Sequence, residues 1–215
     1  GRRKERLDAL VARIVDAGGK ALALPGDVAV EADARLSVED TVAAFGRIDI
    51  LINSAGVNEA GGIETLALEQ WHRVIDINLM GTIYTRRAAF PHMKAQGAGD
   101  IINLSSTAGR RSGAKFAAYA TSKFGVTGFS EALRQEGGTL GIRVAVVEPG
   151  ATATEISDSI SDPKWRAAMH EHTHKPGAME TADIIDAIML IVSLPRRANV
   201  TRLLIQPTID VAPMP

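Results

Sequence analysis

The chain predicts an α/β fold in which helices cover both faces of a parallel, doubly wound sheet. Two observations support this. Short apolar runs alternate with longer helical patterns, as in successive βαβ units. The apolar runs are dense rather than alternating, as expected of strands that are covered on both faces. No repeat, low-complexity tract or flexible linker divides the sequence, so residues 1–215 are expected to form one three-layer domain.

Five helical patterns alternate with five apolar runs. Helices are expected at residues 3–17, 31–45, 68–96, 116–136 and 181–194. Strands are expected at residues 21–24, 48–53, 100–105, 143–147 and 202–205. The least regular stretch, residues 151–179, is longer than a βα connection of about 2–6 residues, so we expect a substrate-binding loop there.

Composition and charge exclude several classes of protein. The hydrophobic fraction of 46% is ample for a core, and a formal net charge of -1 gives no reason to expect nucleic acid or an anionic membrane as partner. Without cysteine the chain has no disulfide, thiolate metal site or cysteine nucleophile, which fits a cytoplasmic protein. Its longest apolar stretch, residues 184–194, contains Asp186 and is shorter than the roughly 20 residues of a membrane span.

Tyr119 and Lys123 form a candidate proton-transfer pair. They lie four residues apart in a helical pattern, so both side chains project from one face. A phenol ordinarily loses its proton near pH 10, and a neighbouring ammonium would lower that pKa toward neutrality. The alternative is a half-buried ring beside a solvated charge, which is the more common arrangement for such a pair.

Small polar residues follow two of the expected strands. Ser105 and Ser106 end the run Ile101–Leu104, and Asn53-Ser54-Ala55-Gly56 ends the run before it. Parallel sheets place ligand contacts at these carboxyl ends, although serines there often only cap or turn the chain.

Taken together, these segments resemble the short-chain dehydrogenase/reductase family in order and spacing. The resemblance rests on Asn53-Ser54-Ala55-Gly56, Asn78 in Ile77–Gly81, Ser106, the pair Tyr119 and Lys123, and Pro149-Gly150. It covers essentially the whole chain. It implies a Rossmann-like domain and an oxidoreductase that interconverts a secondary alcohol and a carbonyl by hydride transfer from a nicotinamide cofactor.

The resemblance also implies a role for each matching residue. Tyr119 would be the catalytic acid/base, Lys123 would lower its pKa and hold the cofactor ribose, and Ser106 would bind the substrate oxygen. Asn78 would bend its helix and hold a water for proton relay. The remaining cofactor contacts would come from Asp27, Val28, Asn53, Ala55, Gly56, Pro149, Gly150, Thr152 and Thr154.

The cofactor is expected to be NADP rather than NAD. Arginine after the second strand of this fold pairs with a 2′-phosphate, whereas an acidic residue there binds ribose hydroxyls. Arg2 and Arg3 stand where that strand would end, and no acid accompanies them. The alternative is two solvated arginines at a helix start, where the helix dipole disfavours them.

The substrate is expected to contact Ser106, Tyr119 and residues 151–179, including Ile156. The segment Arg202–Thr208 resembles a subgroup acting on 3-hydroxy acids, and Arg110 and Arg111 are either contacts for a carboxylate or solvated loop charges. Three alternate histidines, His170, His172 and His174, have no acidic cluster beside them, so no metal site is expected.

Three other interpretations remain open. Ser106 with a lysine would suit a hydrolase, but no histidine stands in a suggestive context. A halohydrin dehalogenase relative would carry arginine in place of Lys123 and lack the nicotinamide site. A catalytically idle or truncated relative would sense dinucleotides or form oligomers. The resemblance also implies a homotetramer or dimer, assembled through the helices expected at residues 68–96 and 116–136 and the apolar final segment.

One family element has no counterpart in this sequence. The sequence has no counterpart of the family's first strand, its glycine-rich turn, the following helix and most of the second strand, a unit of roughly 30 or more residues. That turn would seat a pyrophosphate at a helix N-terminus. The domain is therefore expected to be N-terminally incomplete, with open strand edges in its sheet.

Overall fold

Four parallel strands form a single sheet in the computed structural model, which describes residues 1–210. Their order is β1-β2-β3-β4, so each strand pairs with the next strand along the chain. The two central strands are almost wholly buried, and the predicted Rossmann-like α/β architecture is confirmed. The strands are β1 (Ile50–Asn53), β2 (Gly99–Leu104), β3 (Ile142–Pro149) and β4 (Arg202–Ile205).

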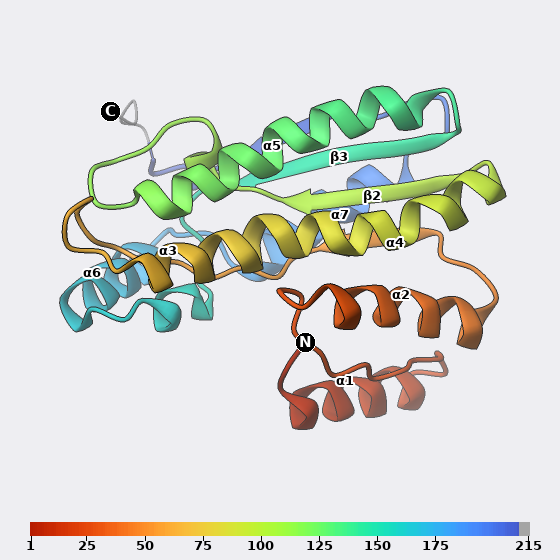
Figure 1. Ribbon diagram of the computed structural model, residues 1–215, viewed down its shortest axis with the longest axis horizontal. Helices are drawn as coiled ribbons and strands as arrows, with labels where there is room; N and C mark the ends of the chain where they lie inside the picture. Colours follow the sequence, from red (N-terminus) through yellow and green to blue (C-terminus); the bar gives the residue numbers. More distant parts are fainter. Residues whose placement is uncertain (211–215) are drawn as a thin grey trace.

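Helices pack on both faces of this sheet (Figure 1). The α-helices are α1 (Lys4–Asp16), α2 (Glu31–Phe45), α3 (Leu68–Ile75), α4 (Gly81–Gln96), α5 (Ala117–Gly138), α6 (Pro163–His174) and α7 (Thr181–Ser193). Helices α4 and α5 cover one face, with α2 packed on α4, whereas α7 covers the other face. No helix within residues 1–210 is long and apolar enough to cross a membrane.

Alternating side chains of the central strands fill two apolar layers. Ile101 and Val144 belong to the cluster under α4 and α5, while their neighbours Ile102 and Ala145 pack with Ile191 of α7. Successive side chains of a strand point to opposite faces, so one dense apolar run supplies both layers.

The expected strand at residues 21–24 is not part of the sheet. A strand needs a neighbour to receive its backbone hydrogen bonds, and no described strand pairs with this segment. The sheet ends instead at β1, where Ile50 and Ile52 are 45% and 46% exposed. β1 is therefore an edge strand of the sheet that the described residues form.

The single helix expected at residues 68–96 is divided by a π-helical turn. This turn, Asp76–Met80, joins α3 to α4 and has the buried Asn78 at its centre. Such turns widen a helix locally, so periodicity over the whole stretch did not reveal this one.

Residues 151–179 contain regular secondary structure, where the sequence predicted a loop. They contain a short 3-10 helix, Glu155–Ser159, followed by α6, whose first turn is capped by Asp162. A bridge between Thr152 and Met179 closes the base of the segment, which we call the lid (residues 151–179). The signal for α6 was Asp162-Pro163, because aspartate is a favoured N-cap and proline a favoured first helical residue.

The three alternate histidines consequently lie on a helix. His170 and His174 stack in parallel with ring centroids 3.9 Å apart. Residues 1–210 contain no group of three or more side chains arranged to hold a metal ion.

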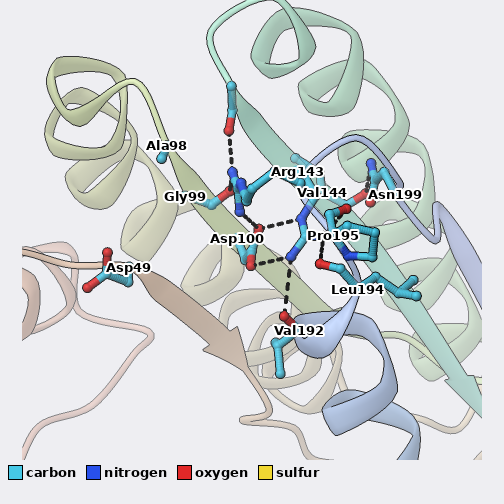
Figure 2. A network of polar contacts seen from close by, with 12 residues as sticks. Asp49, Ala98, Gly99, Asp100, Arg143, Val144, Val192, Leu194, Pro195 and Asn199 are labelled. Atoms are coloured by element: carbon cyan, nitrogen blue, oxygen red, sulfur yellow. Dashed lines mark hydrogen bonds and ion pairs between the residues drawn. The ribbon is translucent and has the colours of Figure 1, made fainter.

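A buried ion cluster fastens the chain after α7 to the amino-terminal ends of the central strands (Figure 2). Arg143 donates to both carboxylate oxygens of Asp100, at 2.8 and 2.7 Å, and also to the carbonyls of Leu194 and Ala198. Arg196 adds a further bond to Asp100. Burial raises the pKa of Asp100, but the two guanidinium groups outweigh burial and hold this pKa below its usual value.

Replacing Arg143 by alanine is predicted to lower the free energy of unfolding by about 3–5 kcal/mol, the cost of breaking a buried ion pair. The side chains of Arg143 and Asp100 are only 8% and 9% exposed. The matched control is Arg47→Ala, which removes the exposed pair of Arg47 with Asp49 and should cost about 1 kcal/mol or less. Urea denaturation measures both; equal costs would contradict the assignment.

Candidate active site

A cavity of about 1080 Å³ lies at the carboxyl ends of the strands. Its wall includes Ser54 after β1, Ser105 and Ser106 after β2, and Pro149 and Gly150 at the end of β3. This is the edge of a parallel sheet where adjoining loops form ligand crevices.

Most of the residues singled out from the sequence line this cavity, including residues from the beginning of the chain. They are Arg2, Arg3, Asp27, Val28, Ala55, Gly56, Ser106, Tyr119, Lys123, Pro149, Gly150, Thr152, Thr154 and Ile156. The fold therefore gathers side chains more than 150 residues apart in the sequence around one space.

Asn78 lies behind the cavity wall rather than in it. Its amide oxygen accepts from the N–H of Val57 at 2.8 Å, and its amide nitrogen donates to the carbonyl of Val57 at 2.9 Å and to Ser122 Oγ at 3.0 Å. The π-helical turn turns this side chain toward the segment after β1. Asn78 thus joins that segment to α5, the helix that carries Tyr119.

Lys123 is buried one turn beyond Tyr119. Its Nζ donates to the carbonyl of Leu104 at 2.8 Å and lies 5.6 Å from the centroid of the Tyr119 ring. Burial lowers the pKa of Lys123 to about 8. The ammonium form therefore predominates at neutral pH, with the neutral amine within reach in mildly alkaline solution.

Tyr119 and Ser106 line the same part of the cavity, so the beginning of α5 meets the end of β2 there. Burial raises the pKa of Tyr119 to about 12, although the bond with Ser106 lowers it in part. The expected lowering by Lys123 is not found. The ammonium is bonded to Leu104 and lies beside the ring, so its attraction for a phenolate is smaller than the cost of burying that charge.

Asn53 does not line the cavity, contrary to expectation. Its amide accepts from Thr85 Oγ1 at 2.7 Å and donates to Asn103 Oδ1 at 3.1 Å. Asn103 in turn donates to Ser130 at 2.8 Å. The side chain therefore links β1 and β2 to α4 and α5, and supports the cavity from below the strand ends.

Both amino-terminal arginines at the cavity rim face carboxylates. Arg2 lies 3.5 Å from Asp27, and Arg3 lies 2.9 Å from Glu155 of the lid. Arg6 contacts the same Glu155 at 2.7 Å. These pairs are largely exposed, so they are easily exchanged for another anion.

The two arginines after Ser106 differ in position. Arg110 donates to the fully buried Glu148 at 2.6 Å, as does Arg202 from β4, so Arg110 secures the end of β3 and is not among the cavity-lining residues. Arg111 does line the cavity. Of the two residues considered for a substrate carboxylate, only Arg111 is suitably placed.

Several lining residues were not recognised in the sequence. Asn58, Arg73 and Phe116 contribute to the wall, and the ring of Phe116 meets that of Trp165 edge-on with centroids 5.7 Å apart. Phe116 immediately precedes α5, which placed it near Tyr119. No local sequence pattern distinguishes Asn58 or Arg73. Both residues contact Ser159 of the lid, which lies far from them in the sequence.

Comparison with known proteins identifies the class of protein. The family model for short chain dehydrogenases matches residues 1–165. The chain therefore belongs to the short-chain dehydrogenase/reductase family of oxidoreductases, as the sequence motifs predicted.

Individual relatives support this identification. An uncharacterized oxidoreductase of Staphylococcus saprophyticus is 34% identical over 187 residues, which span 85% of this chain and 74% of the relative. A 3-oxoacyl-[acyl-carrier-protein] reductase of Synechocystis is 35% identical over 72% of this chain, but the match covers only 62% of the reductase. The closed form of a serine dehydrogenase complexed with NADP+ superposes with a TM-score of 0.87 at 30% identity, covering 99% of this chain and 85% of that one.

Asn78→Ala is predicted to destabilise the fold by about 2–6 kcal/mol, because it leaves two buried backbone groups of Val57 without partners at about 1–3 kcal/mol each. Asn199→Ala, which removes one exposed amide that donates to Val144 at 3.3 Å, is the control and should change stability by about 0.5 kcal/mol or less. Equal urea midpoints for wild type and Asn78→Ala would contradict the role given to this amide.

Proposed function

We propose that this protein is an NADP-dependent oxidoreductase that interconverts a secondary alcohol and a carbonyl compound, with Tyr119 as the acid/base. The observation that carries the proposal is the convergence of Tyr119, Ser106 and Lys123 on one cavity at the strand ends. Each of these side chains comes from a different position in the sequence, and together they form a proton donor, its hydrogen-bond partner and a cation.

The cavity has room for a nicotinamide beside these groups. A Cβ atom built on Gly56 would lie 3.6 Å from both Asn78 Oδ1 and Lys123 Nζ, so the absence of a side chain leaves this part of the wall open. When bound, the cofactor would supply the hydride. Lys123, Ala55, Gly56, Pro149, Gly150, Thr152 and Thr154 are the residues of the wall that would hold it.

Tyr119 is suited to donate a proton during carbonyl reduction. With its pKa raised to about 12, the phenol is protonated at neutral pH. As negative charge develops on the substrate oxygen, the phenol gives up its proton to that oxygen. The Ser106 hydroxyl lines the cavity beside the phenol and would donate a hydrogen bond to the same substrate oxygen.

Lys123 supplies the compensating charge. Its ammonium lies beside the Tyr119 ring and would stabilise the phenolate left after proton transfer. With a pKa of about 8, Lys123 loses this charge as the pH rises through that value. Alkaline solution should therefore slow reduction, because the neutral amine no longer attracts the negative charge that forms on the phenol as its proton leaves.

The arginines at the rim support the choice of NADP. Arg2, Arg3 and Arg6 bring three positive charges to one end of the cavity, where they face two carboxylates. A phosphate carries more charge than a carboxylate and bonds the planar guanidinium in two places, so it would compete for these groups. The related serine dehydrogenase was solved with NADP+, which agrees with this choice.

The substrate class follows from the lid and remains a prediction. Ile156, Phe116 and Met169 give the cavity apolar walls near Tyr119, and Arg111 would meet a carboxylate. A small hydroxy acid fits these features and the resemblance of the Arg202–Thr208 segment. A dimer or tetramer likewise stays a prediction.

Tyr119→Phe is predicted to lower the rate of NADPH-dependent carbonyl reduction by about 10²–10⁴-fold, the usual contribution of a general acid. Cofactor affinity should stay within about threefold, because the ring and Lys123 remain. NADPH absorbance at 340 nm and fluorescence titration measure the two effects. Tyr84→Phe, which changes the other tyrosine of the chain, is the control; retained turnover in Tyr119→Phe would overturn the assignment.

The double change Arg2→Ala and Arg3→Ala is predicted to weaken NADPH binding by about 10–100-fold, the loss of one or two charge-assisted bonds, with little effect on NADH. The control is Arg13→Ala, which changes an exposed arginine of α1 and should leave the affinity for NADPH unchanged. Equal use of the two cofactors by wild type, unaltered in the double variant, would exclude this role.

A further inference from the structure

We infer that Glu59 and Ser159 are positioning residues. They join the part of the lid that precedes α6 to the run Val57–Glu59, so that the substrate side of the cavity is formed before substrate binds. This inference rests on the proposed function. Its basis is the run Val57–Glu59, in which each residue is held by a different part of the molecule.

The first link is the catalytic framework itself. Asn78 binds both the N–H and the carbonyl of Val57, as a second strand would. Because Asn78 also contacts Ser122 on α5, the position of Val57 is set relative to Tyr119 and Lys123. The position at which the chain continues to Asn58 is therefore fixed relative to α5.

The second link reaches the lid. Ser159 Oγ accepts from the N–H of Asn58 at 2.7 Å, and it lies 3.1 Å from the carbonyl of the same residue. Ser159 ends the short helix that begins after Thr154 and includes Ile156. The same hydroxyl lies 2.7 Å from the carbonyl of Ile156, so its one proton is shared between two carbonyls, while its oxygen accepts from Asn58 and ties this helix to the segment after β1.

The third link is a fully buried carboxylate. Glu59 is 0% exposed and accepts from Ser161 N at 2.9 Å, from Ser161 Oγ at 2.7 Å and from Arg73 at 2.7 Å. Gln70 of α3 is a fourth donor, at 3.3 Å. A buried carboxylate is stable only when it is paired and hydrogen-bonded. Two of these donors belong to Ser161, just before α6, and the other two belong to α3.

The three links have one consequence for substrate binding. Ile156, Asp158 and Ser159 line the cavity from the lid, while Asn58 and Arg73 line it from the body of the domain. The bonds made by Ser159 and Glu59 set the distance between these two walls. Loss of either residue should loosen the substrate wall and leave the cofactor wall, built from the strand ends, as it was.

Hydrogen exchange followed by mass spectrometry tests this in the protein without substrate. Glu59→Gln and Ser159→Ala should speed exchange in peptides covering residues 155–174, with α5 and β3 unchanged. Ser159→Thr, which keeps the hydroxyl, should restore slow exchange. Glu64→Gln, an exposed change in the same connection, is the matched control. Should Glu59→Gln fail to fold, the two Ser159 variants carry the test.

Kinetics separate positioning from general stability. The KM for the carbonyl substrate should rise about tenfold in Ser159→Ala, the effect of one lost hydrogen bond, with the NADPH dissociation constant within twofold. Faster hydrogen exchange in the lid of a variant, in a protein that turns over no carbonyl, would support the positioning role of Glu59 and Ser159 and count against the proposed function alone. Lid exchange equal to that of wild type, or faster exchange throughout the chain, would overturn the positioning role.

Discussion

A buried side-chain amide, that of Asn78, joins the segments on which the cleft depends. It satisfies two backbone groups of Val57 and contacts Ser122 of α5, and the π-helical turn around it makes this reach possible. Without a partner, each of those buried backbone groups would carry a desolvation cost of about 1–3 kcal/mol. The strand end at Gly56, the helix bearing Tyr119 and the segment leading to the lid are therefore positioned together.

The chemistry of the cleft follows from burial within this framework. Burial keeps the phenol of Tyr119 protonated and makes the ammonium of Lys123 more acidic, so the proton donor and its neighbouring cation both favour carbonyl reduction at neutral pH. At the opposite ends of the strands, Asp100 and Arg143 anchor the chain after α7, which leaves the carboxyl ends free to form the cavity. The stabilising ion cluster and the candidate active site thus lie at opposite ends of the strands.

The sequence predicted the three-layer architecture and four of its five expected strands, because buried parallel strands leave local patterns. Most of the site residues predicted from the sequence line the cavity, among them the pair Tyr119 and Lys123. It did not predict the π-helical turn, since one extra residue in a turn hardly alters periodicity. Residues 21–24 have a strand's composition, but pairing is a tertiary property. Glu59 and Asn58 were missed for the same reason: their partners in the lid lie about 100 residues away.

Transfer of a labelled hydride is the most direct test of the proposed reaction. The protein is incubated with NADPH that carries deuterium at C4 of the nicotinamide ring and with a panel of small ketones, aldehydes and oxo acids, and the products are analysed by mass spectrometry. Deuterium on the former carbonyl carbon, delivered from only one of the two C4 positions, is the predicted result. Binding of NADPH with no alcohol formed, or an alcohol without deuterium on that carbon, would contradict the account.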